Sequence, residues 1–220
     1  MLKLETYTDK FTGIPWILDK ETRKRFCRVV AGFCWPRDIR TPGAVVALAE
    51  EADADPVDGF RVLRLAGFEQ HKDPEQLLEL AAAVAPLVGA RAGESAVGVW
   101  VGNPWHAFRS RLKLFNERLT REGRRRISLQ PAPGMGDGGQ LLADLAPMLT
   151  ARRLGRKTLE IDRRDLVTLI EDAGQDPRQA IEHFPAVAAL AWAVSWCEEH
   201  KPRLGRQQTR SATADEVAGY

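Results

Sequence analysis

The segment that decides the fold is Phe26-Cys27-Arg28-Val29-Val30-Ala31-Gly32-Phe33-Cys34-Trp35-Pro36. It is rich in β-branched and apolar residues and stops at a proline, so it predicts a strand that ends at Trp35. Two more apolar runs follow and predict strands over residues 43–50 and 60–68. Because the connections are short, we expect these three strands to be antiparallel neighbours.

The chain then alternates between helix and strand patterns. Asp73 suits an N-cap and Pro74 the first helical position, so a helix is expected that ends near Gly89. The apolar run over residues 95–101 predicts a parallel strand covered on both faces. We therefore expect an α/β fold with a mixed sheet flanked by helices, in which three antiparallel strands precede parallel ones. Further helices are expected over residues 105–122, 140–154, 162–173 and 176–200. Short strands are expected over residues 126–129 and 158–161.

The same patterns suggest a division of the chain into three parts. Residues 1–25 are expected to form an N-terminal arm, with a short hairpin that packs Trp16 on the domain. Residues 26–201 form the α/β domain. Residues 202–220 are polar and show no periodicity, which is typical of a flexible tail.

Composition limits the classes of protein that fit. The chain has 220 residues, 44% of them hydrophobic, which suits one domain with a substantial core. A net charge of +2 means that nucleic-acid binding would need a local basic patch. Cys27, Cys34 and Cys197 show no CxxC spacing, so a reduced, cytoplasmic protein is expected. The most apolar run, residues 184–197, predicts a core helix, and no membrane association is expected.

The order of elements resembles the RNase H-like fold and, more narrowly, the C-terminal nuclease domain of phage large terminases. In that family a strand ends in Gly, an apolar residue and Asp, where this chain has Gly32-Phe33-Cys34. A later strand ends in an acidic residue where this chain has Gly102-Asn103. No GxxxxGK[ST] motif is present, so no packaging ATPase is expected within this sequence. The segments that carry the resemblance are residues 29–36, 43–50 with 60–68, 97–103 and 182–193.

The resemblance implies a two-metal nuclease site, which this chain does not reproduce. Such a site needs several carboxylates around two Mg²⁺ or Mn²⁺ ions. The matching positions hold Cys34, Asn103 and Glu182, of which only Glu182 is acidic. We therefore expect degenerate catalytic positions, no metal site and no cofactor, with Mg or Mn required only if the chain is active. The nearby acids Asp38, Glu50 and Glu51 could act as replacement ligands in such an active site, but a solvated position in a loop or at a strand end is the favoured interpretation for each.

Two basic clusters are candidates for contact with nucleic acid, because arginine and lysine neutralise phosphates without reading sequence. One follows the helix expected over residues 105–122 and its exit, and the other covers residues 152–164. The alternative is a solvated helix face, which Glu117 and Glu122 favour. We select as candidate nucleic-acid-binding residues Arg121, Arg124, Arg125, Arg126, Arg152 and Arg153.

Other patterns are weaker. The glycine-rich loop at residues 134–139 lacks a nucleotide-binding motif, and a plain flexible loop is favoured. The four histidines show no ligand spacing, so surface or helix-end roles are expected. Trp192 and Trp196 lie one helical turn apart, which indicates core packing or a partner-docking stripe rather than base stacking.

Together these features predict a phage or prophage-associated protein that resembles a terminase nuclease but does not cut. Its expected role is that of a DNA-packaging or nucleic-acid-binding accessory. The expected partners are DNA and the packaging ATPase or another phage protein. Two alternatives stay open: an active metal-dependent DNA nuclease, and an interaction or structural protein without a nucleic-acid role.

Overall fold

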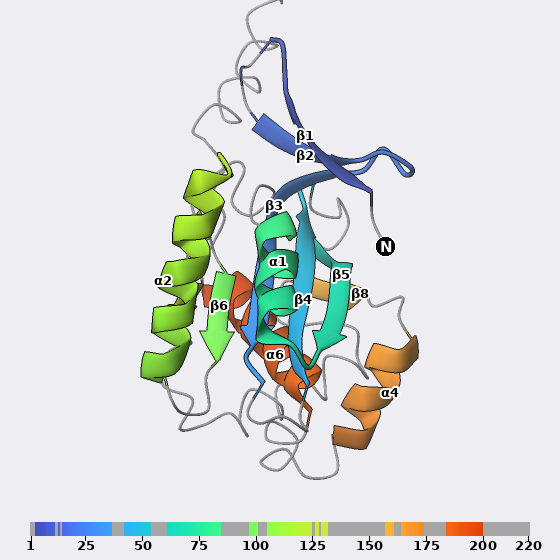
Figure 1. Cartoon of the computed structure of the whole chain (residues 1–220). Helices are drawn as coiled ribbons and strands as arrows, with labels where there is room; N and C mark the ends of the chain where they lie inside the picture. The colour runs from blue at the N-terminus through green and yellow to red at the C-terminus, as the bar shows by residue number, and fades with distance from the viewer. Residues whose placement is uncertain are drawn as a thin grey trace, which may run out of the picture.

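The computed structural model describes residues 3–11, 13, 15–36, 42–53, 61–84, 97–100, 105–124, 126–127, 129–131, 157–160, 164–173 and 184–199 (Figure 1). The elements in chain order are β1 Leu4–Thr8, β2 Pro15–Asp19, β3 Arg25–Cys34, β4 Gly43–Glu51, β5 Arg61–His71, α1 Pro74–Val84, β6 Val97–Trp100, α2 Trp105–Arg121, β7 Leu129–Pro131, β8 Lys157–Glu160, α4 Arg164–Ala173 and α6 Pro185–Glu199. The expected helix over 140–154, the glycine-rich loop and the tail lie outside the described residues.

The strands in the described part of the chain form one sheet around β3. Five of them, β1 to β5, pair in sequence order and all antiparallel. One edge of β3 contacts β4, while the other is shared by β2 at Phe26 and by β6 at residues 31–34. β6 is parallel to β3, β7 is parallel to β6, and β8 lies parallel to β5 at the far edge. The carboxyl ends of β3 and β6 therefore lie next to each other.

The predicted fold class, an RNase H-like mixed sheet that starts with three antiparallel strands, needs correction. The main body of the sheet is a continuous antiparallel meander of five strands, because β1 and β2 extend it ahead of β3. The sequence pattern assigns these two strands to an N-terminal arm instead. The parallel pairings involve short strands of three or four residues, β6, β7 and β8. The sheet extends to β1 and β2 because β3 is long. β6 pairs only with residues 31–34 of β3, which leaves Arg25 and Phe26 free to pair with β2 on the same edge.

Helices cover the two faces of the sheet (Figure 1). A side chain at Gly43 would meet Leu77 of α1, and Phe33 lies 6.0 Å from Phe108 of α2 between ring centroids. A side chain at Gly32 would meet Ala189 of α6. Gly32 and Phe33 are consecutive in β3 and so point to opposite faces, which places α2 on one face and α6 on the other.

α6 is apolar on every side, and the structure buries it accordingly. Its residues from Pro185 to Val194 are buried, and Trp192 stacks on Trp196 with 5.2 Å between ring centroids. The expectation of a core helix is confirmed, and Trp192 belongs to the core. Among the described residues, no helix combines the length and hydropathy needed to cross a membrane.

The contact of α6 with β3 is made backbone to backbone. A Cβ built at Gly32 would stand 1.8 Å from the carbonyl oxygen of Ala189, which no real side chain tolerates. Glycine is therefore required at this point of the strand for close approach of the helix, and not for its conformational freedom.

The β1–β2 hairpin is tied to the following turn through Asp19, which is 1% exposed. Its carboxylate accepts hydrogen bonds from the Thr22 hydroxyl at 2.6 Å and from the backbone N–H of Lys3 at 3.1 Å. Burial acts to raise the pKa of Asp19, but these bonds and those from the Thr22 and Glu21 backbone outweigh it, and the net pKa is lowered. The expected hairpin is thus present, with Trp16 packed against Cys27 and Ala52.

We predict that Gly32→Ala lowers the free energy of unfolding by about 3 kcal/mol or more, because α6 must move away from β3. Urea unfolding followed by circular dichroism measures the change. Gly123→Ala is the matched control: Gly123 has nothing within 4 Å but a φ of +69°, so only a backbone cost of about 1–2 kcal/mol is expected. Equal losses of stability in the two variants would contradict the close approach.

Candidate functional site

The two strand ends expected to form the site lie side by side. β3 and β6 pair in parallel, with Cys34 opposite Trp100 (Figure 1). Such an edge is where open α/β sheets usually hold their ligands. Of the three predicted catalytic positions, the structure describes Cys34, whereas Asn103 and Glu182 lie outside the described residues.

Cys34 is part of the core. Its side chain is 2% exposed, and burial raises its thiol pKa to about 12. Its Sγ lies 3.9 Å from the carbonyl oxygen of Trp35, as a weak donor. A neutral, soft thiol is a poor ligand for Mg²⁺ or Mn²⁺, which prefer oxygen. The residue at this strand end therefore does not fit the metals that the family resemblance implies.

Aromatic rings close the α2 side of this strand end. The half-buried ring of Trp35 meets Phe108 edge-on, with 4.7 Å between centroids, and lies 6.0 Å from Phe33. Phe108 comes from α2, so the same contacts hold the start of that helix against β3. The arrangement makes the end of β3 an apolar packing site.

The acids considered as replacements lie at the opposite end of β3. Glu50 is 0% exposed and accepts a hydrogen bond from Arg28 Nε at 2.7 Å. Glu51 pairs with Lys24 and Arg64. Arg28 and Cys34 are six positions apart, which is about 20 Å along a strand. The suggestion that Glu50 or Glu51 rescues a metal site beside Cys34 is therefore wrong, while Asp38 lies outside the described residues.

The buried pair of Arg28 and Glu50 also anchors α6. Arg28 is 4% exposed and donates from Nη2 to the carbonyl oxygen of Cys197 at 3.1 Å, in the last turn of that helix. This carbonyl belongs to the negative end of the helix dipole, where a cation is favourable. Sequence reasoning missed this pair, although a charged residue inside the apolar segment from Phe26 to Cys34 was a signal for it.

Among the described residues, no group of three or more His, Cys, Asp or Glu is placed to hold a metal ion. The ring of His71, at the end of β5, accepts a hydrogen bond at Nδ1 from the backbone N–H of Asp73 at 2.9 Å. Asp73 accepts one from the N–H of Glu75 and so caps α1 as expected. The expectation of a helix-end role holds for this histidine.

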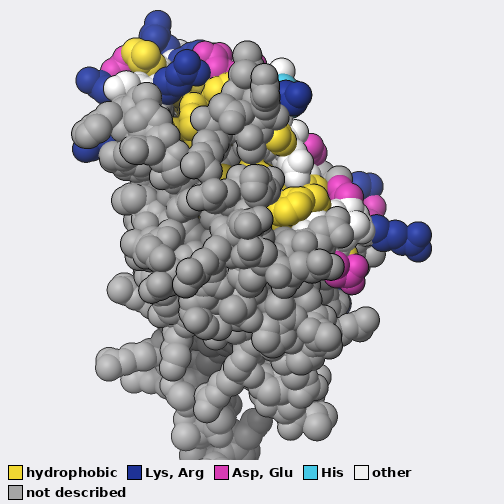
Figure 2. Space-filling view, turned by 90° about the horizontal axis from the view of Figure 1, so that it is seen from below, with side chains coloured by type: hydrophobic (Ala, Val, Ile, Leu, Met, Phe, Trp, Pro, Cys, Tyr) yellow, Lys and Arg dark blue, Asp and Glu magenta, His cyan; other side chains and the backbone are white. Residues whose placement is uncertain are grey.

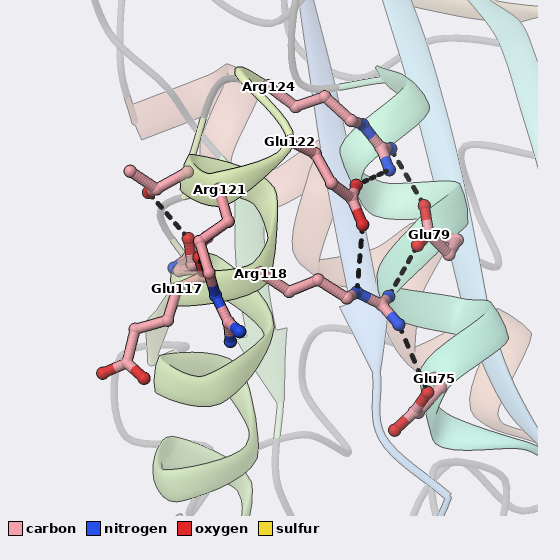
Figure 3. Close-up of polar contacts among 9 residues, drawn as sticks. Glu75, Glu79, Glu117, Arg118, Arg121, Glu122 and Arg124 are labelled. Carbon is pink, nitrogen blue, oxygen red and sulfur yellow. Dashed lines mark hydrogen bonds and ion pairs between the residues drawn. The ribbon is translucent and has the colours of Figure 1, made fainter.

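The basic residues of α2 and of the segment that follows it fall into three groups by their partners. Arg118 and Arg124 form a network with three glutamates that joins α2 to α1 (Figure 3). Arg118 contacts Glu79 at 2.6 Å, and Arg124 contacts the other oxygen of Glu79 at 2.9 Å. Glu75 and Glu122 complete the network. Arg124, one of the predicted nucleic-acid-binding residues, is thus paired with acids.

The other predicted binding residues differ in their contacts. Arg121 donates to the backbone carbonyl of Glu117 at 3.4 Å, one turn earlier (Figure 3). Arg126 donates to the Thr120 hydroxyl at 2.8 Å. Both side chains are exposed, and their charges are not neutralised by these bonds. The remaining three, Arg125, Arg152 and Arg153, lie outside the described residues.

The third group lies in the first half of α2. Arg109, Arg111 and Lys113 are exposed, and within the described part of the chain no acidic side chain pairs with them. On the face seen in Figure 2, the described Lys and Arg side chains are interspersed with acidic and hydrophobic ones. Pairing with neighbouring acids therefore decides which of these cations can contact a phosphate. The sequence shows these three residues as basic, but it does not reveal which arginines α1 neutralises.

Comparisons of the chain with protein-family models, with curated proteins and with solved structures found no match.

We predict that the native protein is unreactive towards a thiol reagent such as DTNB at pH 8, because all three cysteines are buried thiols. Three thiols should react after denaturation in guanidinium chloride. Fast labelling of the native protein that disappears in Cys34→Ser, but persists in Cys27→Ser, would contradict the raised thiol pKa of Cys34.

We also predict that Arg28→Met lowers the free energy of unfolding by about 3–5 kcal/mol, because it leaves the buried Glu50 carboxylate without its cation. Urea unfolding measures the change. The double variant Arg28→Met/Glu50→Leu should recover most of the stability, since both buried charges are gone. A double variant as unstable as the single one would mean that packing, and not charge, accounts for the effect.

Proposed function

We propose that this protein is a nucleic-acid-binding accessory protein that does not cleave its ligand, with a role in phage or prophage DNA packaging. The observation that carries the binding is a group of exposed cations at the start of α2 that have no acidic partner within the described part of the chain: Arg109, Arg111 and Lys113. The phage context rests on the resemblance of the sequence segments to the terminase nuclease domain. The expected partners, DNA and the packaging ATPase or another phage protein, belong to the same proposal.

Three positive charges within five residues suit a phosphate backbone. Each phosphate contact releases counterions from the nucleic acid, so it contributes affinity that falls with salt. Phosphate contacts do not depend on base sequence, which suits an accessory protein that binds DNA of any sequence. These three residues replace Arg124 as the proposed contacts, because the Arg124 guanidinium is already paired with Glu79 and Glu122.

The non-cleaving part of the proposal is supported by Cys34. The strand end that would carry the first metal-binding acid holds a buried neutral thiol beside packed aromatic rings. Glu50 and Glu51, two of the three acids considered as replacements, take part in ion pairs at the other end of β3. A cytoplasmic location is part of the proposal, because the three cysteines are thiols and thiols suit a reducing compartment.

We predict that the protein binds DNA with an affinity that falls steeply with salt, and that Arg109→Ala/Arg111→Ala/Lys113→Ala reduces this dependence. Fluorescence anisotropy with a labelled oligonucleotide between 25 and 200 mM NaCl (on the order of a tenfold range of salt) gives the slope of log Kd against log salt. The slope should drop by about 0.9 for each phosphate that the variant no longer neutralises. Binding that is undetectable at low salt would instead favour an interaction protein without a nucleic-acid role.

The matched control removes the same charge elsewhere. Lys3, Lys10 and Lys20 are exposed residues of the β1–β2 hairpin and its flanks, so Lys3→Ala/Lys10→Ala/Lys20→Ala changes net charge equally. This control should keep the slope of the native protein. If both triple variants weaken binding to the same extent, binding reflects net charge and not α2.

The nuclease alternative is tested separately by nicking of supercoiled plasmid with Mn²⁺. We expect no nicking by the native protein beyond that of the Glu182→Ala variant. Metal-dependent cutting that Glu182→Ala abolishes would establish the active-nuclease alternative and reject the non-cleaving proposal.

A further inference from the structure

We propose that the first half of α2, residues 109–114, enters the major groove of duplex DNA. This inference rests on the proposed nucleic-acid binding and narrows its ligand to a B-form duplex. Residues 109–114 are named the groove segment.

The faces of α2 follow from its buried residues. Phe108, Phe115 and Leu119 are buried and mark the side of the helix that packs on the protein. Residues advance by about 100° each around an α-helix. Arg109 and Lys113, four residues apart, share one flank of the exposed side. Arg111, two residues from Arg109 and so about 200° around the axis, lies on the other flank. This is the side from which Arg118, two turns later, pairs with Glu75 and Glu79 of α1.

Between these flanks lies the outermost strip of the groove segment. Ser110 and Leu114 are exposed and lie one turn apart, and Leu114 is 64% exposed. In a major groove, an apolar side chain such as that of Leu114 can contact the thymine methyl group. A charged flank on each side with a small polar and an apolar residue between them therefore matches the cross-section of that groove.

The dimensions agree with this placement. A helix with its side chains is about 10–12 Å across, and the B-form major groove is about 12 Å wide. Phosphates line both sides of the groove, so Arg109 and Lys113 would meet one strand while Arg111 meets the other. The major groove of A-form RNA is deep and narrow and does not admit side chains in this way. Duplex RNA is therefore expected to bind less well than duplex DNA.

The neighbouring helix limits how far α2 can enter. Glu75, in the first turn of α1, pairs with Arg118, and Glu79 pairs with both Arg118 and Arg124. The two helices thus run in the same direction and lie alongside each other, and only the beginning of α2 reaches past the beginning of α1 (Figure 1). Glu117 is exposed on the outer side and would repel phosphates, which marks the end of the groove segment.

The test compares three labelled probes of one sequence with the native protein: duplex DNA, single-stranded DNA and duplex RNA. Anisotropy at low salt should give at least about tenfold tighter binding to duplex DNA than to the other two. Methyl green, which occupies the major groove, should displace the protein, whereas the minor-groove ligand netropsin should not. Leu114→Glu, which puts a negative charge between the flanks, should weaken duplex binding by at least tenfold. The matched control Phe11→Glu, at a fully exposed position of the β1–β2 hairpin, should change it less than threefold.

The outcomes separate this inference from the proposed function. Equal binding to all three probes, or displacement by netropsin and not by methyl green, overturns the groove segment while nucleic-acid binding stands. Binding to none of the probes overturns both. Thermal unfolding of Leu114→Glu should match that of the native protein, because the side chain is exposed; if that variant fails to fold, Arg111→Glu on the second flank takes its place.

Discussion

The structure depends on the contact of α6 with the backbone of β3 at Gly32. The helix can approach so closely only because the strand has no side chain there, and Ala189 supplies a small residue on the helix side. Close approach brings the apolar surface of α6 over β3 and β4 and completes the core on that face. Burial of apolar surface is the main favourable term in folding. The absence of a Cβ at Gly32 is therefore a condition for the burial of α6.

A polar interaction fixes the other end of the same helix. Arg28 binds Glu50 and the carbonyl of Cys197, about two turns of α6 beyond Ala189. Gly32 allows the close approach of the helix, whereas the Arg28 guanidinium ties the carboxyl end of the helix to β3. The two contacts together define both the distance and the direction of α6. Because buried charges cost free energy to desolvate, the pair contributes to positioning more than to stability.

The strand pattern was predictable from local sequence, because apolar and β-branched runs specify β3, β4 and β5 directly. The extent of the sheet was not, since Leu4–Thr8 is short and only its pairing with Pro15–Asp19 makes it a strand. In the candidate site, the sequence correctly placed Cys34 at a strand end beside the strand Val97–Trp100. It could not reveal that Arg124 is paired, because Glu79 is 45 residues away along the chain. For the same reason the positions of Glu50 and Glu51 relative to Cys34 emerge only from the fold.

The pairing of Gly32 with Ala189 has a consequence for tracing the ancestry of this chain. Any descendant that keeps the helix in place must keep a residue without a side chain in the strand and a small residue opposite it. Exposed positions outside the proposed binding residues can change more freely meanwhile. Gly32 and Ala189, together with the charged pair Arg28 and Glu50, would then be recognisable in related chains whose overall sequence identity has become low.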